Sequence, residues 1–235
     1  MKVSIAVPVH DPDGKYSAHL RELIESAHSQ SEPPLEVVLT ANHQLPYLHE
    51  LECAAGERFK VIFKLVDVSG AAANTNQAVG LCTGDVVKIM YQDDYFFDVG
   101  ALSLVANLLE EGHSRWVALG CIHRFEDQDS YTRVMVPRYS MGLLWGKNTI
   151  GAPSVVAFRR ESFVPFDEAM VFMFDCDWYF RMNQSFGRPL TVDSTQIAIR
   201  IHSGQATHWA RKKLKSERIR TLKKSLISLT RKPGL

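Results

Sequence analysis

Short apolar runs alternate with longer amphipathic segments over roughly the first 110 residues, and this alternation constrains the fold more than any other feature. The apolar runs have the length and β-branched content of strands, and the segments between them have helical periodicity. Parallel strands need a crossover, which is usually a helix, so the pattern predicts parallel βαβ units. We expect strands at Val3–Val9, Leu35–Thr40, Lys60–Val66, Val86–Met90, Trp116–Ile122, Val155–Phe158 and Leu190–Ile201. The early helices are expected at Tyr16–Ser29, Pro46–Ala55, Ala71–Leu81 and Val99–Glu111.

Polar or acidic residues follow each of the first four predicted strands: His10, Asn42, Asp67 and the pair Asp93-Asp94. In open parallel sheets, ligands bind outside the carboxyl ends of the strands, so we expect a site for a polar ligand at this edge. The sequence has no GxGxxG after the first strand and no GxxxxGK[ST] motif. This argues against a dinucleotide-binding dehydrogenase and against a P-loop enzyme.

Asp93 and Asp94 place two adjacent carboxylates at the end of an apolar strand. Neighbouring like charges repel, and near a buried sheet they need a cation or strong hydrogen-bond donors. Carboxylate oxygens suit Mg²⁺ or Mn²⁺, ions that commonly also hold the phosphates of a substrate. The alternative is a solvated turn that caps the helix near Asp98.

Five segments occur in an order that points to one family. They are Val3–Val9, Gly70–Ala78 before Thr83-Gly84-Asp85, Gln92-Asp93-Asp94, Phe174–Arg181 and Arg200-Ile201-His202. Through them the sequence resembles the family-2 glycosyltransferases, inverting enzymes of the GT-A fold that transfer a sugar from a nucleotide-diphosphate donor. Each segment alone is a weak signal, but five in order over about 200 residues are specific.

The resemblance implies an α/β fold of the GT-A type, a mostly parallel central sheet flanked by helices. It implies that Asp93 and Asp94 bind Mn²⁺ or Mg²⁺, with His202 as another metal ligand or a phosphate donor. It also implies that Asp175 is the catalytic base. The residues expected to bind the nucleotide sugar are Pro8, His10, Asn42, Asn74 and Asp93. The residues expected in the acceptor region are Gly151, Pro153, Asp177 and Trp178.

Asp175, Asp177 and His202, in the late motifs, can be interpreted as functional or as structural residues. As a base, Asp175 would take a proton from an acceptor hydroxyl, which then attacks the anomeric carbon opposite the diphosphate and inverts the stereochemistry. Alternatively, Asp175 is an acid favoured by a helix dipole, and Asp177 and Arg181 form a surface ion pair. A lone histidine such as His202 is often partly buried and bonded to backbone.

Four positions depart from the family pattern. The first acid of the metal motif falls on Tyr91 and the first acid of the later pair on Phe174. Ala73 replaces an arginine, and Thr40–His43 stands where an acidic pair often contacts the nucleotide base. These departures keep open the alternative of a non-catalytic sugar-nucleotide-binding or scaffold protein. A second alternative is a metal-dependent phosphohydrolase that uses the same acidic pair, Asp93 and Asp94.

The charge of the chain is unevenly distributed. Of 27 Lys and Arg and 26 Asp and Glu, ten bases but only one acid lie in residues 209–235. We therefore expect a GT-A domain at 1–208 and a basic amphipathic helical extension at 209–235. Its apolar residues recur at helical intervals: Leu214, Ile219, Leu222, Leu226 and Leu229. Such a helix can lie on an anionic membrane or pack on the acidic body.

These features predict a metal-dependent inverting transferase that moves a sugar to a hydroxyl of a saccharide or lipid-linked acceptor, in cell-surface polysaccharide or glycolipid synthesis. No helix-turn-helix or aromatic RNA-binding motif indicates a nucleic-acid partner. The four cysteines form no CxxC pair, which favours a reducing, cytoplasmic setting. We see no signal peptide and no apolar run near the ~18 residues that span a bilayer. We therefore expect a cytoplasmic protein, peripheral at the inner face of the cell membrane.

Overall fold

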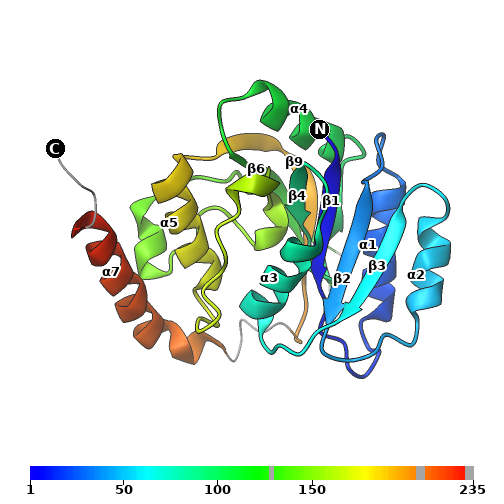
Figure 1. Ribbon diagram of the computed structural model, residues 1–235, viewed down its shortest axis with the longest axis horizontal. Helices are drawn as coiled ribbons and strands as arrows, with labels where there is room; N and C mark the ends of the chain where they lie inside the picture. The colour runs from blue at the N-terminus through cyan, green and yellow to red at the C-terminus, as the bar shows by residue number, and fades with distance from the viewer. Residues whose placement is uncertain (127–129, 205–209, 231–235) are drawn as a thin grey trace.

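The computed structural model describes residues 1–126, 130–204 and 210–230. Its strands form a sheet in the order β3-β2-β1-β4-β8-β6-β9-β5, with β7 paired to β6. Helices flank this sheet (Figure 1). The expected α/β class with a mostly parallel sheet is therefore confirmed.

The first half of the sheet is the parallel unit that the alternating pattern predicts. Its elements are β1 (Val3–Pro8), α1 (Ser17–His28), β2 (Glu36–Ala41), α2 (Leu48–Ala55), β3 (Lys60–Leu65), α3 (Ala71–Leu81) and β4 (Val86–Ile89). Each neighbouring pair of these strands is parallel. Right-handed crossovers put α1 and α2 on one face and α3 on the other, because the chain steps outward from β1 to β3 and then returns to β4.

The second half of the sheet contains the antiparallel strands. Strand β8 runs antiparallel to both β4 and β6, whereas β6 and β9 are parallel to each other. The elements are β5 (Tyr95–Phe96), α4 (Ala101–Glu111), β6 (Trp116–Phe125), β7 (Ser130–Tyr131), β8 (Val156–Arg159) and β9 (Leu190–Ile201). The pattern did not predict β5 or β7, because two residues show no periodicity.

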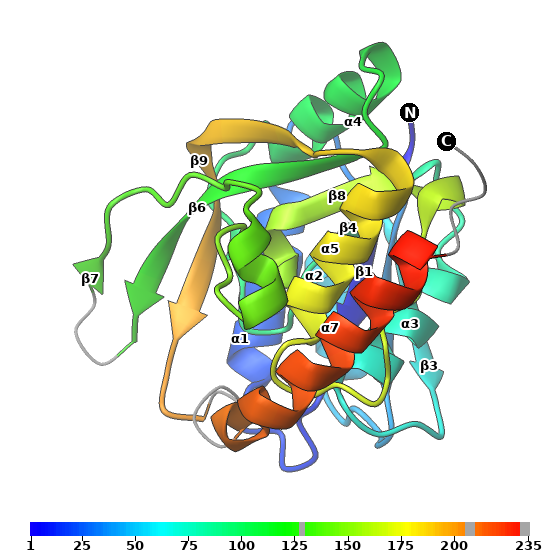
Figure 2. The same cartoon turned by 90° about the vertical axis from the view of Figure 1, so that its left-hand side faces the viewer.

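Helices α5 (Phe174–Phe186) and α7 (Leu214–Thr230) lie side by side, away from α1 and α2 (Figures 1 and 2). Short 3-10 helices lie at Met141–Trp145 (η1), Pro153–Val155 (η2), Arg160–Ser162 (η3) and Arg211–Lys213 (η4).

Helix α7 covers much of the predicted basic extension, and it packs on the body through a mixed face, on which Leu214 of the predicted apolar stripe contacts the core. Glu217 and Thr221 are buried, whereas Ile219 of the predicted apolar stripe is 50% exposed. The side chains of Leu226 and Leu229 and the expected boundary at 208/209 lie outside the described part. No helix within the described ranges is long and apolar enough to cross a membrane.

A buried carboxylate fastens the amino ends of β1 and β2, at the edge of the sheet opposite the predicted site. Glu36 is 5% exposed, and its Oε1 accepts hydrogen bonds from Ser4 Oγ at 2.8 Å, Thr83 N at 2.7 Å and Thr83 Oγ1 at 2.9 Å. A buried carboxylate is tolerated when donors surround it in this way. This network serves stability, since it lies at the far ends of the strands.

Glu36→Ala should lower the free energy of unfolding by roughly 2–4 kcal/mol, because these donors lose their buried acceptor. Urea denaturation followed by circular dichroism measures the change. The exposed Glu32→Ala is the control and should unfold like the wild type. Equal midpoints for Glu36→Ala and Glu32→Ala would show that the network contributes nothing.

Candidate active site

The segment after β4 distributes three polar side chains in three directions. Its turn is closed by a hydrogen bond from Asp94 N to Tyr91 O at 3.0 Å. Gln92 turns toward β1: its Oε1 accepts from His10 N at 2.6 Å and its Nε2 donates to His10 O at 3.0 Å. Gln92 therefore holds the backbone after β1 beside the carboxylate pair, a role that the sequence did not predict.

Asp93 lies next to His202, the histidine that follows β9. Their side chains are 3.1 Å apart, between Asp93 Oδ2 and His202 Nε2. The rings of Tyr16 and His19 flank His202, with centroids 5.2 and 5.6 Å from its own. Two of the predicted metal ligands, 109 residues apart in the sequence, are thus brought together.

Asp94 points into the interior and does not join Asp93 and His202. It is 2% exposed, and its Oδ1 accepts a hydrogen bond from Arg200 N at 3.1 Å. Burial, reinforced by the negative charge of Asp93, raises the pKa of Asp94 well above its usual range. Within the described residues, no group of three or more His, Cys, Asp or Glu side chains could hold a metal ion.

Lys88 is the cation buried near Asp94. It is completely buried in β4, and its Nζ donates to Ile89 O at 2.9 Å and to Ser154 O. Burial lowers the pKa of Lys88 to about 7, against the opposing charge of Asp94. Ser154 Oγ in turn accepts from Tyr91 N at 2.8 Å. In the sequence, the feature that could have indicated the role of Lys88 is its position inside an otherwise apolar strand.

Asp175 lies in the first turn of α5, partly buried. Its Oδ2 accepts from Asn148 Nδ2 at 2.7 Å and its Oδ1 from Cys176 N at 2.6 Å. Burial raises the pKa of Asp175 to about 6, although these two hydrogen bonds oppose the shift. The negative charge of Asp175 in turn raises the pKa values of Tyr91, Cys176 and Tyr179, which lie close to it. A carboxylate with such a pKa is ionised at neutral pH and is basic enough to accept a proton.

Tyr91 links the two acidic segments. Its ring stacks on Phe174, with centroids 6.5 Å apart. Burial raises the pKa of the Tyr91 hydroxyl, and the charges of Asp175, Asp93 and Asp94 raise it further. Asp93 and Asp94 are therefore near Tyr91 together with Asp175, although Asp175 is far from them in the sequence.

The predicted donor-binding residues lie at the carboxyl ends of β1 and β2. Pro8 ends β1, and His10 is exposed just beyond it. Asn42 is also exposed, and its Oδ1 lies 3.1 Å from His43 Nδ1. Asn74 is 9% exposed; its Nδ2 donates to Val9 O at 3.1 Å and Thr40 O at 3.0 Å. Its Oδ1 has no hydrogen-bond partner among the described residues.

Asp11 belongs to the same region and was not predicted as a site residue. It is 2% exposed, and its carboxylate accepts from Tyr47 Oη at 2.7 Å and Tyr16 N at 3.0 Å. Its own N–H donates to His43 Nε2 at 3.0 Å. Asp11 therefore fixes the loop after β1 against the loop after β2.

The predicted acceptor residues divide into a loop and a buried helix face. Gly151 lies in the loop after Asn148 with a φ of 125°, and its carbonyl accepts from Asn148 Nδ2 and Tyr179 Oη. Pro153 begins η2 two residues later and is buried. Asp177 is 1% exposed and pairs with Arg181 at 2.7 Å and Lys224 at 2.9 Å, whereas Trp178 is completely buried. Asp177 and Trp178 thus face the interior and α7.

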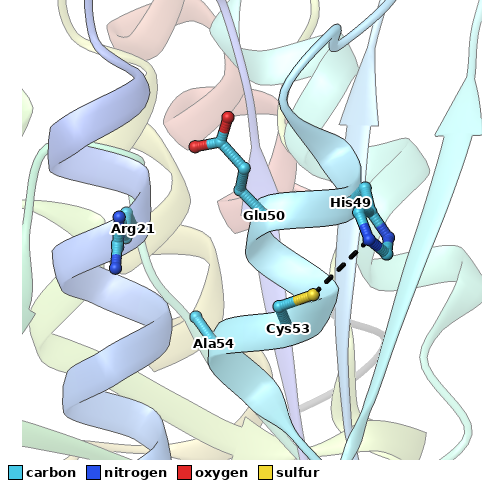
Figure 3. A pocket seen from close by; sticks show the side chains of 5 residues that line it. All are labelled: Arg21, His49, Glu50, Cys53 and Ala54. Carbon is cyan, nitrogen blue, oxygen red and sulfur yellow. Dashed lines mark hydrogen bonds between the residues drawn. The ribbon is translucent and has the colours of Figure 1, made fainter.

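A separate surface pocket lies between α1 and α2 (Figure 3). Arg21, His49, Glu50, Cys53 and Ala54 line it. Cys53 Sγ lies 3.6 Å from His49 Nε2. None of these side chains belongs to the predicted site.

Comparison with solved structures places this geometry in a known fold. The structure of S. aureus TarS 1-349 matches with a TM-score of 0.64 at 19% identity, over 85% of this chain and 60% of that one. Its complex with UDP-GlcNAc matches with a TM-score of 0.65 at 18% identity, over 88% and 61%. A structure of a longer S. aureus TarS chain matches with a TM-score of 0.63 at 18% identity, over 92% of this chain and 39% of that one. The chain thus spans less than two thirds of these neighbours, and the likeness supports the expected GT-A fold.

Sequence comparison identifies the family. No curated protein sequence matches the chain significantly. The family model described as Glycosyl transferase family 2 matches residues 4–182, well over half of the chain. The predicted fold and family are confirmed, and the chain belongs to glycosyl transferase family 2.

Proposed function

We propose that the protein is a metal-dependent inverting glycosyltransferase. It moves a sugar from a nucleotide-diphospho-sugar to a hydroxyl of a saccharide or lipid-linked acceptor, in the synthesis of cell-surface polysaccharide or glycolipid. The observation that carries the proposal is the stacking of Tyr91 on Phe174, with ring centroids 6.5 Å apart, which brings the segment of Asp93 beside the segment of Asp175. Family membership supports the reaction class. The TarS complexes with UDP and UDP-GlcNAc make a uridine-diphospho-sugar the first donor to test.

Asp93 and His202 are the residues that would hold Mn²⁺ or Mg²⁺. A carboxylate and an imidazole 3.1 Å apart fit such an ion, because its remaining positions are commonly filled by substrate phosphates and water. When bound, the ion would offset the negative charge that grows on the departing nucleoside diphosphate. We assign Asp94 to anchoring β9 through Arg200 N, in place of the metal-binding role expected from the sequence.

Asp175 is the proposed base. Its carboxylate takes the proton of the acceptor hydroxyl, and the resulting oxygen attacks the anomeric carbon from the face opposite the diphosphate. Asn148 orients the carboxylate through its 2.7 Å hydrogen bond. Burial keeps the pKa of Asp175 near 6, so the group is ionised yet still basic at neutral pH.

The remaining predicted residues serve the donor and the acceptor. For the donor we propose contacts with Pro8, His10, Asn42 and Asn74, whose buried Oδ1 is available to accept a hydrogen bond. For the acceptor we propose the loop at Gly151 and Pro153, beside Asn148. We assign Asp177 and Trp178 supporting roles behind Asp175, because both are buried.

We further propose that the protein is cytoplasmic and that the outer face of α7 contacts an anionic membrane. Lys212, Ile219 and Lys223 are exposed on α7 and on the turn before it. Basic residues near an anionic surface each contribute about 1 kcal/mol of attraction. Such a contact would bring the enzyme to a lipid-linked acceptor.

Asp175→Asn should reduce turnover of the nucleotide sugar by about 10²–10⁴-fold, because the amide cannot accept the proton. Affinity for the nucleoside diphosphate should stay near the wild-type value. Steady-state kinetics and calorimetric titration measure the two quantities.

The control for this variant is Asp193→Asn, which removes an exposed carboxylate and should keep wild-type turnover. In the wild type, kcat should rise with pH through about 6 as Asp175 loses its proton. The residual activity of Asp175→Asn should lack this rise. Undiminished turnover in Asp175→Asn would remove Asp175 from the mechanism.

Removal of divalent metal with EDTA should abolish turnover, and Mn²⁺ or Mg²⁺ should restore it. Asp93→Asn and His202→Ala should each weaken the Mn²⁺-dependent binding of nucleoside diphosphate by roughly tenfold or more, since each removes a ligand. Calorimetry with and without Mn²⁺ separates this loss from general damage. Full activity in EDTA would contradict metal dependence.

The reaction products distinguish the competing functions. A glycosyltransferase releases nucleoside diphosphate, whereas a metal-dependent phosphohydrolase releases phosphate. A scaffold protein binds the nucleotide but turns over nothing. Release of phosphate, or binding without any turnover, would overturn the proposed function.

A further inference from the structure

Helix α7 inserts one acidic side chain into the segment just before α5. Residues 209–235 contain ten bases and a single acid, Glu217, which is 5% exposed. Its Oε1 accepts from Val171 N at 2.8 Å, and its Oε2 accepts from Phe172 N at 3.0 Å and Met173 N at 2.7 Å. These three backbone N–H groups directly precede the helix that carries Asp175.

This contact resembles the capping of a helix by an anion, but the carboxylate comes from a distant segment. Backbone N–H groups at the start of a helix lack partners within the helix, and an anion there is favoured by the helix dipole. Hydrogen bonds to a charged acceptor are also stronger than those between neutral groups. Glu217 therefore fixes where α5 begins.

A second set of contacts holds the first turn of α5 from the same helix. Arg220 forms two hydrogen bonds with Asp167, at 2.6 and 3.0 Å. Lys224 pairs with Asp167 and, at 2.9 Å, with Asp177. Burial alone would raise the pKa of Asp167, but the bonds from Arg220 and Lys224 hold it well below its usual range. Asp177 is two residues from Asp175, so these ion pairs hold the helical turn that carries the candidate base.

A third contact reaches the segment that carries Asn148. Arg218 Nε donates to Trp145 O at 2.7 Å. Gly146 has a φ of 73°, and a Cβ placed there would lie 2.7 Å from Leu214 Cδ1. Helix α7 thus packs tightly against the turn before Asn148, whose amide hydrogen-bonds Asp175.

We propose that α7 positions Asp175, with Glu217 as the principal positioning residue. Asn148 and Asp175 are joined by a hydrogen bond, and α7 contacts the segment before each of them. Glu217 holds the start of α5, and Arg218 holds the turn before Asn148. The inference rests on the proposed function only in treating Asp175 as the base. It adds that the charged helix at the end of the described chain is a structural part of the active site.

The test is Glu217→Gln, compared with Lys215→Gln, which also removes one charge from α7 but at an exposed position. In Glu217→Gln we expect kcat in solution, without membranes, to fall by about 10- to 100-fold, because small displacements of a catalytic group have effects of this size. The dissociation constant for nucleoside diphosphate with Mn²⁺ should stay within about twofold. Lys215→Gln should match the wild type in both.

Two further measurements do not depend on turnover. Amide hydrogen exchange at residues 171–173 should accelerate in Glu217→Gln and not in Lys215→Gln. The carboxyl carbon of Asp175, assigned by NMR with Asp175→Asn, should titrate near pH 6 in the wild type and closer to the ordinary aspartate pKa in Glu217→Gln. The neighbouring groups Tyr91, Cys176 and Tyr179 are the same in both proteins.

The outcomes separate this inference from the proposed function. A wild type without turnover would overturn the proposed function, while the titration of Asp175 would still decide whether α7 positions it. A Glu217→Gln protein that melts earlier but keeps wild-type kcat and Asp175 titration would overturn the positioning role. Should Glu217→Gln fail to fold, Arg218→Ala removes the hydrogen bond to Trp145 O, and unchanged kcat and Asp175 titration there would also overturn the positioning role.

Discussion

The two adjacent carboxylates that follow β4 have different surroundings, and the rest of the site depends on this division. Asp94 lies in the interior, where Arg200 N donates to it and the buried Lys88 supplies a compensating charge. Buried charges persist only with such partners. Asp93 is thereby left half-buried beside His202, with 20% of its side chain exposed. Lys88 also donates to Ser154 O, and Ser154 accepts from Tyr91 N, so the same buried cation holds the backbone of this turn.

The second half of the site depends on a different set of long-range contacts. Asp175 is held by Asn148 from one side and by the start of α5 from the other. Helix α7 contacts the segment that precedes each support: Arg218 donates to Trp145 O, before Asn148, and Glu217 accepts from Met173 N, before α5. The charges of α7 are therefore divided between its two sides. Most of its bases are exposed, whereas its acid, Glu217, is buried against the body.

The sequence predicted the parallel half of the fold and the edge that carries the site, because buried parallel strands read as apolar runs and their polar ends meet. The resemblance paired Asp93 with His202, and the structure brings the two together. It could not separate Asp93 from Asp94, since the direction of each side chain depends on partners that only the fold brings together: Arg200 and His202, which are distant in sequence, and the side chain of Lys88, which is buried in β4. Trp178 was expected in the acceptor region but is completely buried, because the sequence of one helix does not reveal which of its faces is covered. Asn148 and Glu217 act through partners distant in sequence, so no local pattern indicated them.

The most direct test of this division is the position of a bound cation. Crystals grown with Mn²⁺ and a nucleoside diphosphate would show the ion by its anomalous scattering. We expect a peak bound by Asp93 and His202, with Asp94 still accepting from Arg200 N and with Asp175 facing the same cavity. A peak coordinated by Asp94, or one placed so that Asp175 faces a different surface, would contradict it.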